Sequence, residues 1–252
     1  MDCSKYNIAY KEISVDKKPL FIFINHRVSI VCWNKIREIL GKCDVVTLDS
    51  HRDFRNGFIF KLDPDETFSS KHHKGNHPHF TLCEEFINWD LSDNEQNRLF
   101  IKEGKKFVGL LNDNFIDVAF MKDLVGDVFW YYSDTENDSS EGGCEDINGK
   151  IHKYHPLPIK EFKIPKRRFI LDIDLDFFVE NPALKNCTLM PQKKMKKYLN
   201  LIRKIMDNPN CLAITLALEP GCCGGKENCL KISKKLSNIV EIGLNKEIEK
   251  FL

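Results

Sequence analysis

Short apolar runs alternate with segments of helical period along this chain. Residues 20–24, 45–48 and 169–171 are uninterrupted apolar or near-apolar runs, which is typical of strands buried on both faces of a parallel sheet. Apolar residues then recur at helical spacing over residues 28–40, and Gly41 is a plausible helix end. This alternation predicts βαβ units and an α/β fold: a three-layer sandwich whose central, mostly parallel sheet is covered on both faces.

The remaining segments extend the same pattern, with one exception. Residues 134–149 are acidic, rich in Ser and Gly and almost free of large apolar groups, so we expect a surface loop there. No repeat or convincing linker divides the chain, and residues 1–252 are therefore expected to form a single domain. The further expected elements are strands at 108–111, 127–131 and 211–218 and helices at about 80–90, 92–104 and 195–206.

Composition and charge remove several function classes. The chain has 252 residues, enough to bury a real core, and its formal net charge of +1 predicts neither nucleic-acid nor membrane affinity. No apolar run precedes Leu20, and residues 20–24 are far too short to span a bilayer. We therefore expect a cytoplasmic protein without a secretory signal, whose ten cysteines are reduced thiols.

Two acidic clusters directly follow two of the predicted strands. Residues 49–53 read Asp-Ser-His-Arg-Asp, and residues 172–176 read Asp-Ile-Asp-Leu-Asp. Ligand sites in open α/β sheets lie beyond the carboxyl ends of the strands, so the clusters share a crevice if their strands are close. Side chains in an extended segment point alternately to its two sides, so every second residue of each cluster faces the same way. In the first cluster these residues are Asp49, His51 and Asp53, and in the second they are Asp172 and Asp174.

Gathered carboxylates favour bound cations. Without cations, they would repel and raise one another's pKa values. Aspartates also act as turn formers at strand ends, but two clusters at matching strand ends, one containing a His, favour a metal site. His26, which follows the first predicted strand, adds an imidazole. Oxygen-rich sites with some imidazole suit manganese, whereas a single Asp/His/Asp set could hold zinc.

This arrangement resembles the arginase/deacetylase superfamily: a His after an early strand, then Asp-x-His-x-Asp, then a late Asp-x-Asp. More narrowly, it is similar to the small arginase-like family that includes bacterial peptide arginases. The closer match is carried by residues 171–178 (Leu-Asp-Ile-Asp-Leu-Asp-Phe-Phe) and 217–225 (Ala-Leu-Glu-Pro-Gly-Cys-Cys-Gly-Gly). Residues 114–117 also resemble a segment of that family, and the similarity covers most of residues 20–225.

The resemblance implies a ureohydrolase with two divalent ions, Mn²⁺ or alternatively Zn²⁺ or Fe²⁺. It implies that Glu219 binds a guanidinium group, that urea is released, and that Asp53 relays a proton to the leaving nitrogen. The substrate would be a guanidino compound, such as an arginine-containing peptide that becomes ornithine-containing. The implied ligands of one ion are His26, Asp49, Asp53 and Asp172, and those of the other are Asp49, His51, Asp172 and Asp174. Candidates for a proton shuttle are His77 and His79.

The chain departs from the family pattern at the late motif, which is shorter than in free-arginine enzymes and lacks their proline. It also has no clear match to the loops that grip the α-amino and α-carboxyl groups, which favours a peptide-embedded or larger guanidino substrate. Two alternatives stay open: a zinc-dependent amide hydrolase or deacetylase using Asp49, His51 and Asp172, and a non-catalytic metal-binding module.

Two further sequence features bear on the partners. Cys222, Cys223 and Cys229 could suggest a zinc or iron–sulfur site, but the neighbouring glycines more simply indicate a tight turn. Residues 160–168 and 192–197 are locally basic, without an aromatic-interleaved recognition motif. We therefore expect neither a nucleic-acid nor a membrane partner, and the oligomeric state stays open.

Overall fold

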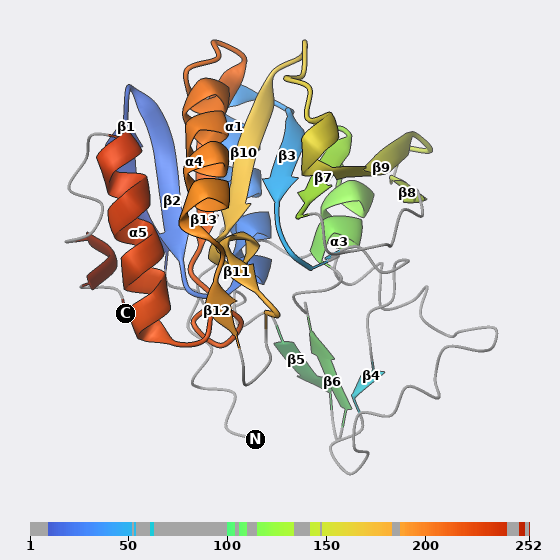
Figure 1. The fold of residues 1–252 in the computed structure, drawn as a ribbon. Coiled ribbons are helices and arrows are strands. Elements are labelled where there is room, and N and C mark those ends of the chain that lie inside the picture. The colour runs from blue at the N-terminus through green and yellow to red at the C-terminus, as the bar shows by residue number, and fades with distance from the viewer. Residues whose placement is uncertain are drawn as a thin grey trace.

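An eight-stranded, mostly parallel sheet forms the centre of the molecule (Figure 1). The six inner strands run parallel, and the strand at each edge is antiparallel to its neighbour. In spatial order the strands are β1 (Tyr10–Val15), β2 (Lys18–Phe23), β13 (Cys211–Ala217), β10 (Phe169–Asp174), β3 (Asp44–Leu48), β7 (Val128–Tyr132), β9 (Ile151–Pro158) and β8 (Gly142–Glu145). The computed structural model describes residues 10–51, 53, 61–62, 100–103, 106–109, 115–133, 142–146, 148–182, 187–240, 247–249 and 252.

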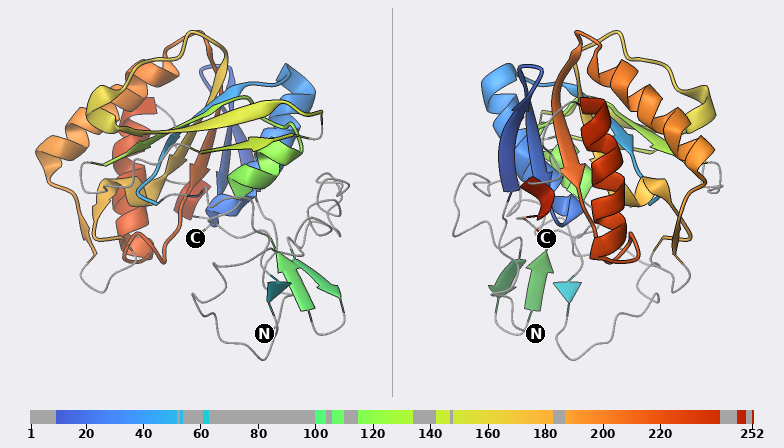
Figure 2. Two further views of the ribbon diagram at one scale, coloured as in Figure 1. Left: turned by 90° about the vertical axis from the view of Figure 1, so that its right-hand side faces the viewer. Right: turned by 60° about the vertical axis from the view of Figure 1, so that its left-hand side comes forward.

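Helices cover both faces of this sheet, which confirms the predicted three-layer α/β sandwich (Figure 2). On one face lie α1 (Ser29–Leu40) and α3 (Phe115–Met121); on the other lie α4 (Gln192–Met206) and α5 (Lys226–Val240). Each layer interface has its own hydrophobic core, and successive strand residues alternate between the two cores, as Val45 and Val46 do. Strands β3 and β10 are buried along their whole length, which explains why their sequences are nearly continuous apolar runs.

Shorter elements surround this frame. Two of them are single 3₁₀ turns: η2, shortly after β2, carries the predicted site residue His26, and η6, directly after β10, carries Asp176. A separate three-stranded sheet and a two-stranded hairpin complete the description. The bounds are η2 (His26–Val28), η5 (Ile159–Glu161), η6 (Leu175–Phe178), β4 (Lys61–Leu62), β5 (Phe100–Glu103), β6 (Lys106–Gly109), β11 (Val179–Glu180) and β12 (Thr188–Leu189).

Two sequence predictions are wrong in part. Residues 100–103 form strand β5 instead of the end of a helix at 92–104; a short segment with two apolar residues fits either period. Residues 142–145 form edge strand β8 instead of a loop, because backbone pairing with β9 does not require apolar side chains. The predicted helix at 80–90 lies outside the described residues, and the single-domain assignment stays a prediction.

Candidate metal centre

The carboxyl ends of four neighbouring strands meet where the sequence predicts a site. Strand β10 lies between β13 and β3 in parallel, so that Asp172 pairs with Thr215 on one side and Thr47 on the other. Strand β2 adjoins β13 in the same direction. Segments that are far apart in the sequence, after β2, β3, β10 and β13, therefore end at one edge of the sheet. This confirms that the two acidic clusters share one edge.

His26 lies at the centre of this edge. It is 1% exposed, and its Nδ1 atom lies 3.2 Å from Asp49 Oδ2, 2.6 Å from Asp53 Oδ2 and 3.3 Å from Asp174 Oδ2. The ring of Phe115, from α3, packs at 5.0 Å between centroids and supports one face of the imidazole. Three carboxylates thus surround a single buried ring nitrogen.

Backbone amides hold the surrounding carboxylates in fixed orientations. Asp49 Oδ1 accepts a hydrogen bond from the His51 amide at 2.7 Å, and Asp174 Oδ1 accepts one from the Asp176 amide at 3.0 Å. Asp176 Oδ1 accepts from the Ser50 amide at 3.1 Å, which joins the two acidic clusters. In each of these carboxylates Oδ1 is engaged with the backbone, and Oδ2 is turned toward a histidine nitrogen.

Several atoms of this cluster have no hydrogen-bond partner within the described part of the chain: His26 Nδ1, Asp53 Oδ2 and Asp176 Oδ2. Yet His26 Nδ1 and Asp53 Oδ2 are 2.6 Å apart, and Asp176 Oδ2 is 2.5 Å from His51 Nδ1. Each of these contacts is an ion pair when the histidine is protonated, and a divalent cation could take the place of that proton. A buried polar atom left unpaired costs about 1–3 kcal/mol. The residues therefore fit divalent cations.

The potential ligand atoms form a continuous chain of groups. In each group the ligand atoms all lie within 4.8 Å of one another. Asp49 and Asp176 each belong to two groups, so the groups are neighbours and not separate sites. The groups that could hold a metal ion at this edge are His26, Asp49 and Asp53; Asp49, Asp174 and Asp176; and His51, Asp176 and Cys222.

Asp172 lies behind His26 and, unlike the other predicted ligands, belongs to none of the groups of potential metal ligands among the described residues. Its Oδ1 accepts hydrogen bonds from Ser29, at 2.9 Å, and from Thr215. Its Oδ2 lies 2.6 Å from His26 Nε2 and accepts from Thr47 at 3.0 Å. Both oxygens are thus engaged. The hydrogen bond that Nε2 donates to Asp172 fixes the ring and leaves Nδ1 facing the other carboxylates, the arrangement that a carboxylate behind a metal-binding histidine usually provides.

The physical reason for this difference is depth in the sheet. Asp172 and Asp174 lie on the same face of β10, as the alternation predicts, but Asp172 still has paired strands on both sides. Side chains from those strands and from α1 therefore reach it. Asp174 is the last residue of the strand, and Asp176 lies in η6 beyond it. The two late carboxylates that face the first acidic cluster are Asp174 and Asp176.

The buried carboxylates of the cluster have strongly shifted pKa values. Burial, and then the charges of neighbouring carboxylates, raise the pKa of Asp49 and Asp174 well above the usual range. Burial raises the pKa of Asp53 to about 7, although His26 opposes the shift. Burial also acts on Asp172, but His26 and hydroxyl hydrogen bonds hold its pKa below the usual value. Burial lowers the pKa of His26, but Asp172 and Asp53 raise it well above normal.

We expect the cation-free protein to lose stability as the pH rises. The folded-state pKa of Asp53, about 7, exceeds an unfolded value of about 3.9. Its contribution to the stability of the folded state is therefore complete below about pH 4 and is lost as the pH rises through about 7. Up to about 4 kcal/mol is expected from this residue. The pKa values of three other groups, His26, Asp49 and Asp174, are also raised, whereas the pKa of Asp172 is lowered.

Urea denaturation in excess chelator, from pH 4 to pH 8, measures this effect. Asp53→Asn removes the titrating carboxyl, and its stability is expected to depend less on pH than that of the wild type. Equal pH dependence in the two proteins would contradict the expectation.

Glu219 follows β13 and lies against the same cluster. It is 8% exposed, and its Oε1 accepts a hydrogen bond from the His26 amide at 2.9 Å. Its φ of 35° lies in the left-handed region, which is unfavourable for a residue other than Gly. The amides of Cys222 and Cys223 both donate to its carbonyl at 2.9 Å, which closes the turn. The fold thus maintains a strained residue whose carboxylate faces the centre.

Sequence reasoning placed most of these residues and missed two. Asp176 extends the Asp172–Asp174 alternation by one step, and that signal could have identified it. Cys222 lies three positions after Glu219, where the neighbouring glycines favour a tight turn over a metal site. His51 is in place with Asp176, and its side chain is 38% exposed. His77 and His79 lie outside the described residues.

A further group of potential ligands, Asp123, Asp146 and His152, lies in another part of the fold. Lys42 forms an ion pair with Asp123, and Asp146 Oδ1 accepts hydrogen bonds from the amides of Asn148 and Lys150 at 2.8 and 3.0 Å. His152 Nε2 lies 2.8 Å from Asp146 Oδ2. The protein itself balances the charge of this group, and its hydrogen bonds explain it as a structural cluster.

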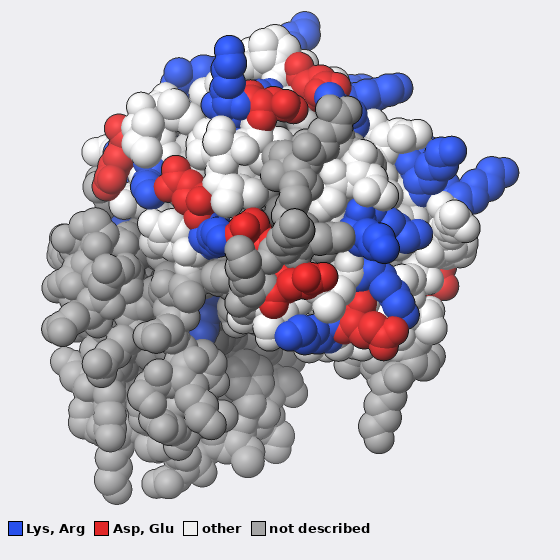
Figure 3. Space-filling model, turned by 90° about the vertical axis from the view of Figure 1, so that its left-hand side faces the viewer, with Lys and Arg blue, Asp and Glu red and all other residues white. Residues whose placement is uncertain are grey.

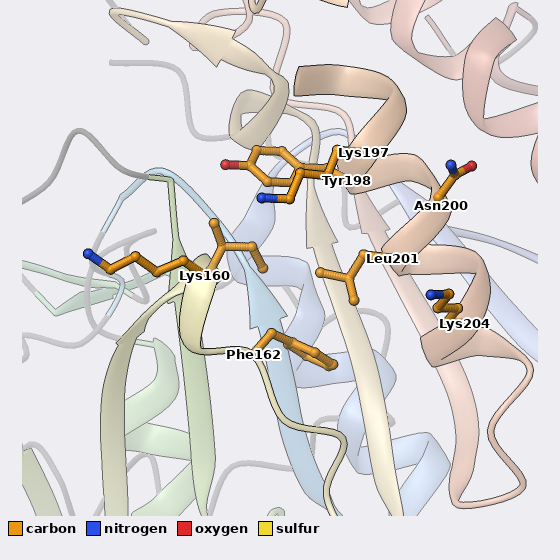
Figure 4. A pocket seen from close by; sticks show the side chains of 8 residues that line it. Lys160, Phe162, Lys197, Tyr198, Asn200, Leu201 and Lys204 are labelled. Atoms are coloured by element: carbon orange, nitrogen blue, oxygen red, sulfur yellow. The ribbon is translucent and has the colours of Figure 1, made fainter. Parts of the chain in front are cut away.

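The two basic stretches of the sequence meet beside a pocket on the α4 side (Figure 4). Lys160 comes from η5, and Lys197 and Lys204 come from α4, around the aromatic rings of Phe162 and Tyr198. None of the predicted site residues lines this pocket. On the face shown in Figure 3, Lys and Arg side chains are interspersed with Asp and Glu among the described residues, so that face presents no large surface of one sign.

Comparison with known proteins does not assign the chain to a family. No protein-family model matches it, and no curated protein matches it. The arginase-like resemblance therefore stays a prediction that rests on the motifs. Within the part of the chain that the structure describes, no helix combines the length and the apolar character needed to cross a bilayer.

Proposed function

We propose that this protein is a hydrolase with two divalent cations that cleaves a guanidino group and releases urea. The observation that carries the proposal is the convergence of buried ligand atoms without hydrogen bonds on one edge of the sheet. Asp49 and Asp174 are shared between the two cation positions. The first position is formed by His26, Asp49, Asp53 and Asp174, and the second by Asp49, His51, Asp174 and Asp176.

This ligand set keeps the order of the resemblance but moves its late pair by two residues. Asp174 and Asp176 take the roles that the motif comparison implies for Asp172 and Asp174. Two distances support the shift: Asp174 Oδ2 is 3.3 Å from His26 Nδ1, and Asp176 Oδ2 is 2.5 Å from His51 Nδ1. Asp172, with both oxygens engaged, is the residue that orients His26.

Divalent cations at these positions would supply the positive charge that lets the carboxylates ionise together and would bring the pKa of a water molecule toward neutrality. Oxygen-rich coordination of the first position suits manganese. The residues of the chain fix where that chemistry occurs. Buried side chains oriented by backbone amides need little rearrangement, and such preorganisation is the main source of electrostatic stabilisation in enzymes.

Glu219 supports a cationic substrate group. Its carboxylate lies close enough to Asp53 and Asp174 to raise the pKa of each, although burial contributes more. A planar guanidinium pairs with a carboxylate through charge-assisted hydrogen bonds that fix its orientation. Bound there, the guanidino carbon would face the cluster. The left-handed backbone of Glu219 is a strained conformation of the kind that is maintained at functional sites.

The proposed reaction adds one water molecule to the guanidino carbon and yields urea and an amine. Asp53 lies within electrostatic range of both His26 and Glu219, and we assign to its carboxyl the transfer of a proton to the leaving nitrogen. Arginine within a peptide is the proposed substrate, because the sequence shows no clear match to the loops that grip the α-amino and α-carboxyl groups of free arginine. A cytoplasmic location belongs to the same proposal.

Metal content and urea release, measured together, test this function. Protein purified without metal and then loaded with manganese is expected to bind two ions per chain and to release urea from an arginine-containing peptide faster than from free arginine. One bound zinc ion with deacetylase activity would favour the amide-hydrolase alternative. Two bound ions without turnover of any guanidino compound would favour a non-catalytic module.

A further inference from the structure

We propose that Cys222 is a ligand of the second cation position, which therefore selects a more thiophilic ion, such as zinc, than the first. This inference rests on the proposed function, because it concerns one of its two cation positions. It makes the positions chemically unequal: the first has oxygen ligands and one imidazole, and the second adds sulfur.

The position of the thiol is the first observation. The Sγ atom of Cys222, His51 Nδ1 and Asp176 Oδ2 all lie within 4.8 Å of one another, a spacing that permits binding to one ion. The three residues come from the segment after β3, from η6 and from the turn after β13. Such a meeting of distant segments is what a tertiary ligand set requires.

A buried carboxylate oxygen without a hydrogen bond is the second observation. Asp176 is fully buried, and its Oδ2 has no hydrogen-bond partner within the described part of the chain. That oxygen forms an ion pair with His51 Nδ1, at 2.5 Å. Its other oxygen accepts from the Ser50 amide, so the carboxylate cannot turn away without losing that bond. A buried oxygen held in this orientation needs a positive charge beside it, which a cation bound by Asp176, His51 and Cys222 would supply.

The turn that carries Cys222 is well fixed. Its amide donates to the Glu219 carbonyl at 2.9 Å, and its carbonyl lies 3.5 Å from Cys187 Sγ, which donates to it. The Gly225 amide donates to the Pro220 carbonyl at 2.7 Å. The thiol is therefore held at one place beside the cluster by backbone bonds on both sides.

The neighbouring thiols are engaged differently. Cys223 and Cys229 are fully buried, and both donate to the Leu218 carbonyl, at 3.3 and 3.1 Å. Cys187 donates to the backbone of Cys222 itself. Of these four cysteines, only Cys222 belongs to a group of potential metal ligands among the described residues. Its thiol also adjoins the Glu219 carboxyl, which places it between the cation position and the proposed guanidinium site.

The donor chemistry determines which ion is favoured. Thiolate and imidazole ligands favour zinc and related ions over manganese, whereas carboxylates favour manganese. A thiol that binds a divalent cation gives up its proton, and the added negative charge strengthens the attraction for the ion. The second position would thus favour zinc over manganese more strongly than the first position does.

Cobalt(II) provides a readout that does not depend on activity. Metal-free wild-type protein loaded with two equivalents of cobalt is expected to show ligand-field bands together with a sulfur-to-cobalt charge-transfer band in the near ultraviolet. Cys222→Ser is expected to keep the ligand-field bands and to lose the charge-transfer band. The matched control is Cys187→Ser, which removes a nearby thiol and should keep both the ligand-field bands and the charge-transfer band.

The possible outcomes separate this inference from the proposed function. Bound cobalt without a charge-transfer band in the wild type, or an unchanged band in Cys222→Ser, overturns the role of Cys222 and leaves the two-cation centre standing. No cobalt binding by folded wild-type protein overturns the centre and this inference with it.

A metal competition gives a second measurement. Cys222→Asp replaces sulfur with oxygen, and its affinity for zinc relative to manganese is expected to fall by roughly 10-fold or more, the scale on which changes around a bound metal alter affinity. An unchanged ratio would contradict the inference.

Discussion

Asp174→Asn is expected to empty both cation positions and to reduce kcat/KM for urea release by roughly 10³-fold or more, since an active site without its principal charges loses about 4 kcal/mol or more of transition-state stabilisation. Asp174 is one of the two shared ligands of the proposed centre, and its Oδ2 lies 3.3 Å from His26 Nδ1. The asparagine amide preserves the shape of the side chain but not the negative charge. Metal content by elemental analysis and urea release measure the two effects.

Asp172→Asn is the matched control, because it makes the same chemical change two residues earlier on the same face of β10. Asp172 contacts no proposed cation and orients His26, so the variant is expected to bind two ions with affinity weakened by roughly 10- to 100-fold. It should also lower the free energy of unfolding, since Ser29, Thr47 and Thr215 donate to that carboxylate.

The comparison of the two variants decides between the two ligand sets. If Asp172→Asn loses both ions while Asp174→Asn keeps one at its normal affinity, the ligand set implied by the family motif is right and the shifted set is wrong. Circular dichroism on both proteins separates metal loss from unfolding.

Glu219→Gln is expected to keep both cations and to lower kcat/KM for an arginine-containing peptide by roughly 10²- to 10³-fold, as for the removal of one electrostatic contact to a reacting group. Glutamine retains an oxygen for the His26 amide, which now donates to Glu219 Oε1 at 2.9 Å. It lacks the charge that a guanidinium group requires. The backbone strain at φ 35° is the same in both proteins, so folding should be little affected.

Steady-state kinetics beside metal analysis test this expectation. Glu227→Gln makes the same substitution on the exposed surface of α5, where the side chain pairs only with Lys231 among the described residues, and it should leave activity unchanged. If Glu219→Gln released urea at the wild-type rate with two ions bound, Glu219 would not be the guanidinium partner.

The pattern of apolar positions was sufficient to predict the layers of this fold. Strands buried on both faces have nearly uninterrupted apolar sequences, and β3 and β10 are such strands. The edge strands β1 and β8 were not predicted, because a strand that pairs on one side and faces solvent has a mixed composition. Strand β9 was also missed; its buried residues His152, Tyr154 and Pro156 form an alternating pattern that a hydrophobicity criterion does not detect.

The site was predictable in outline and less so in detail. Aspartates after two strands and His26 after another indicated where ligands would meet, since parallel strands end together. Which carboxylates of the run Asp172-x-Asp174-x-Asp176 face the first acidic cluster depends on the exact end of β10 and on the hydroxyls of Thr47 and Thr215 beside it. Those neighbours are set by sheet order, which local sequence does not contain. The place of Cys222 could not be predicted from local sequence either, because only the tertiary fold brings it to Asp176.

The position of β10 between β13 and β3 also affects how the protein folds. The proposed ligands before residue 60 can meet those from β10 and η6 only after a strand from the C-terminal half has inserted next to β3, which is more than a hundred residues earlier in the chain. Pairings across such sequence separations form slowly. The ligand groups of the candidate metal centre are therefore complete only once the central sheet has formed, so the proposed cations would bind late in folding.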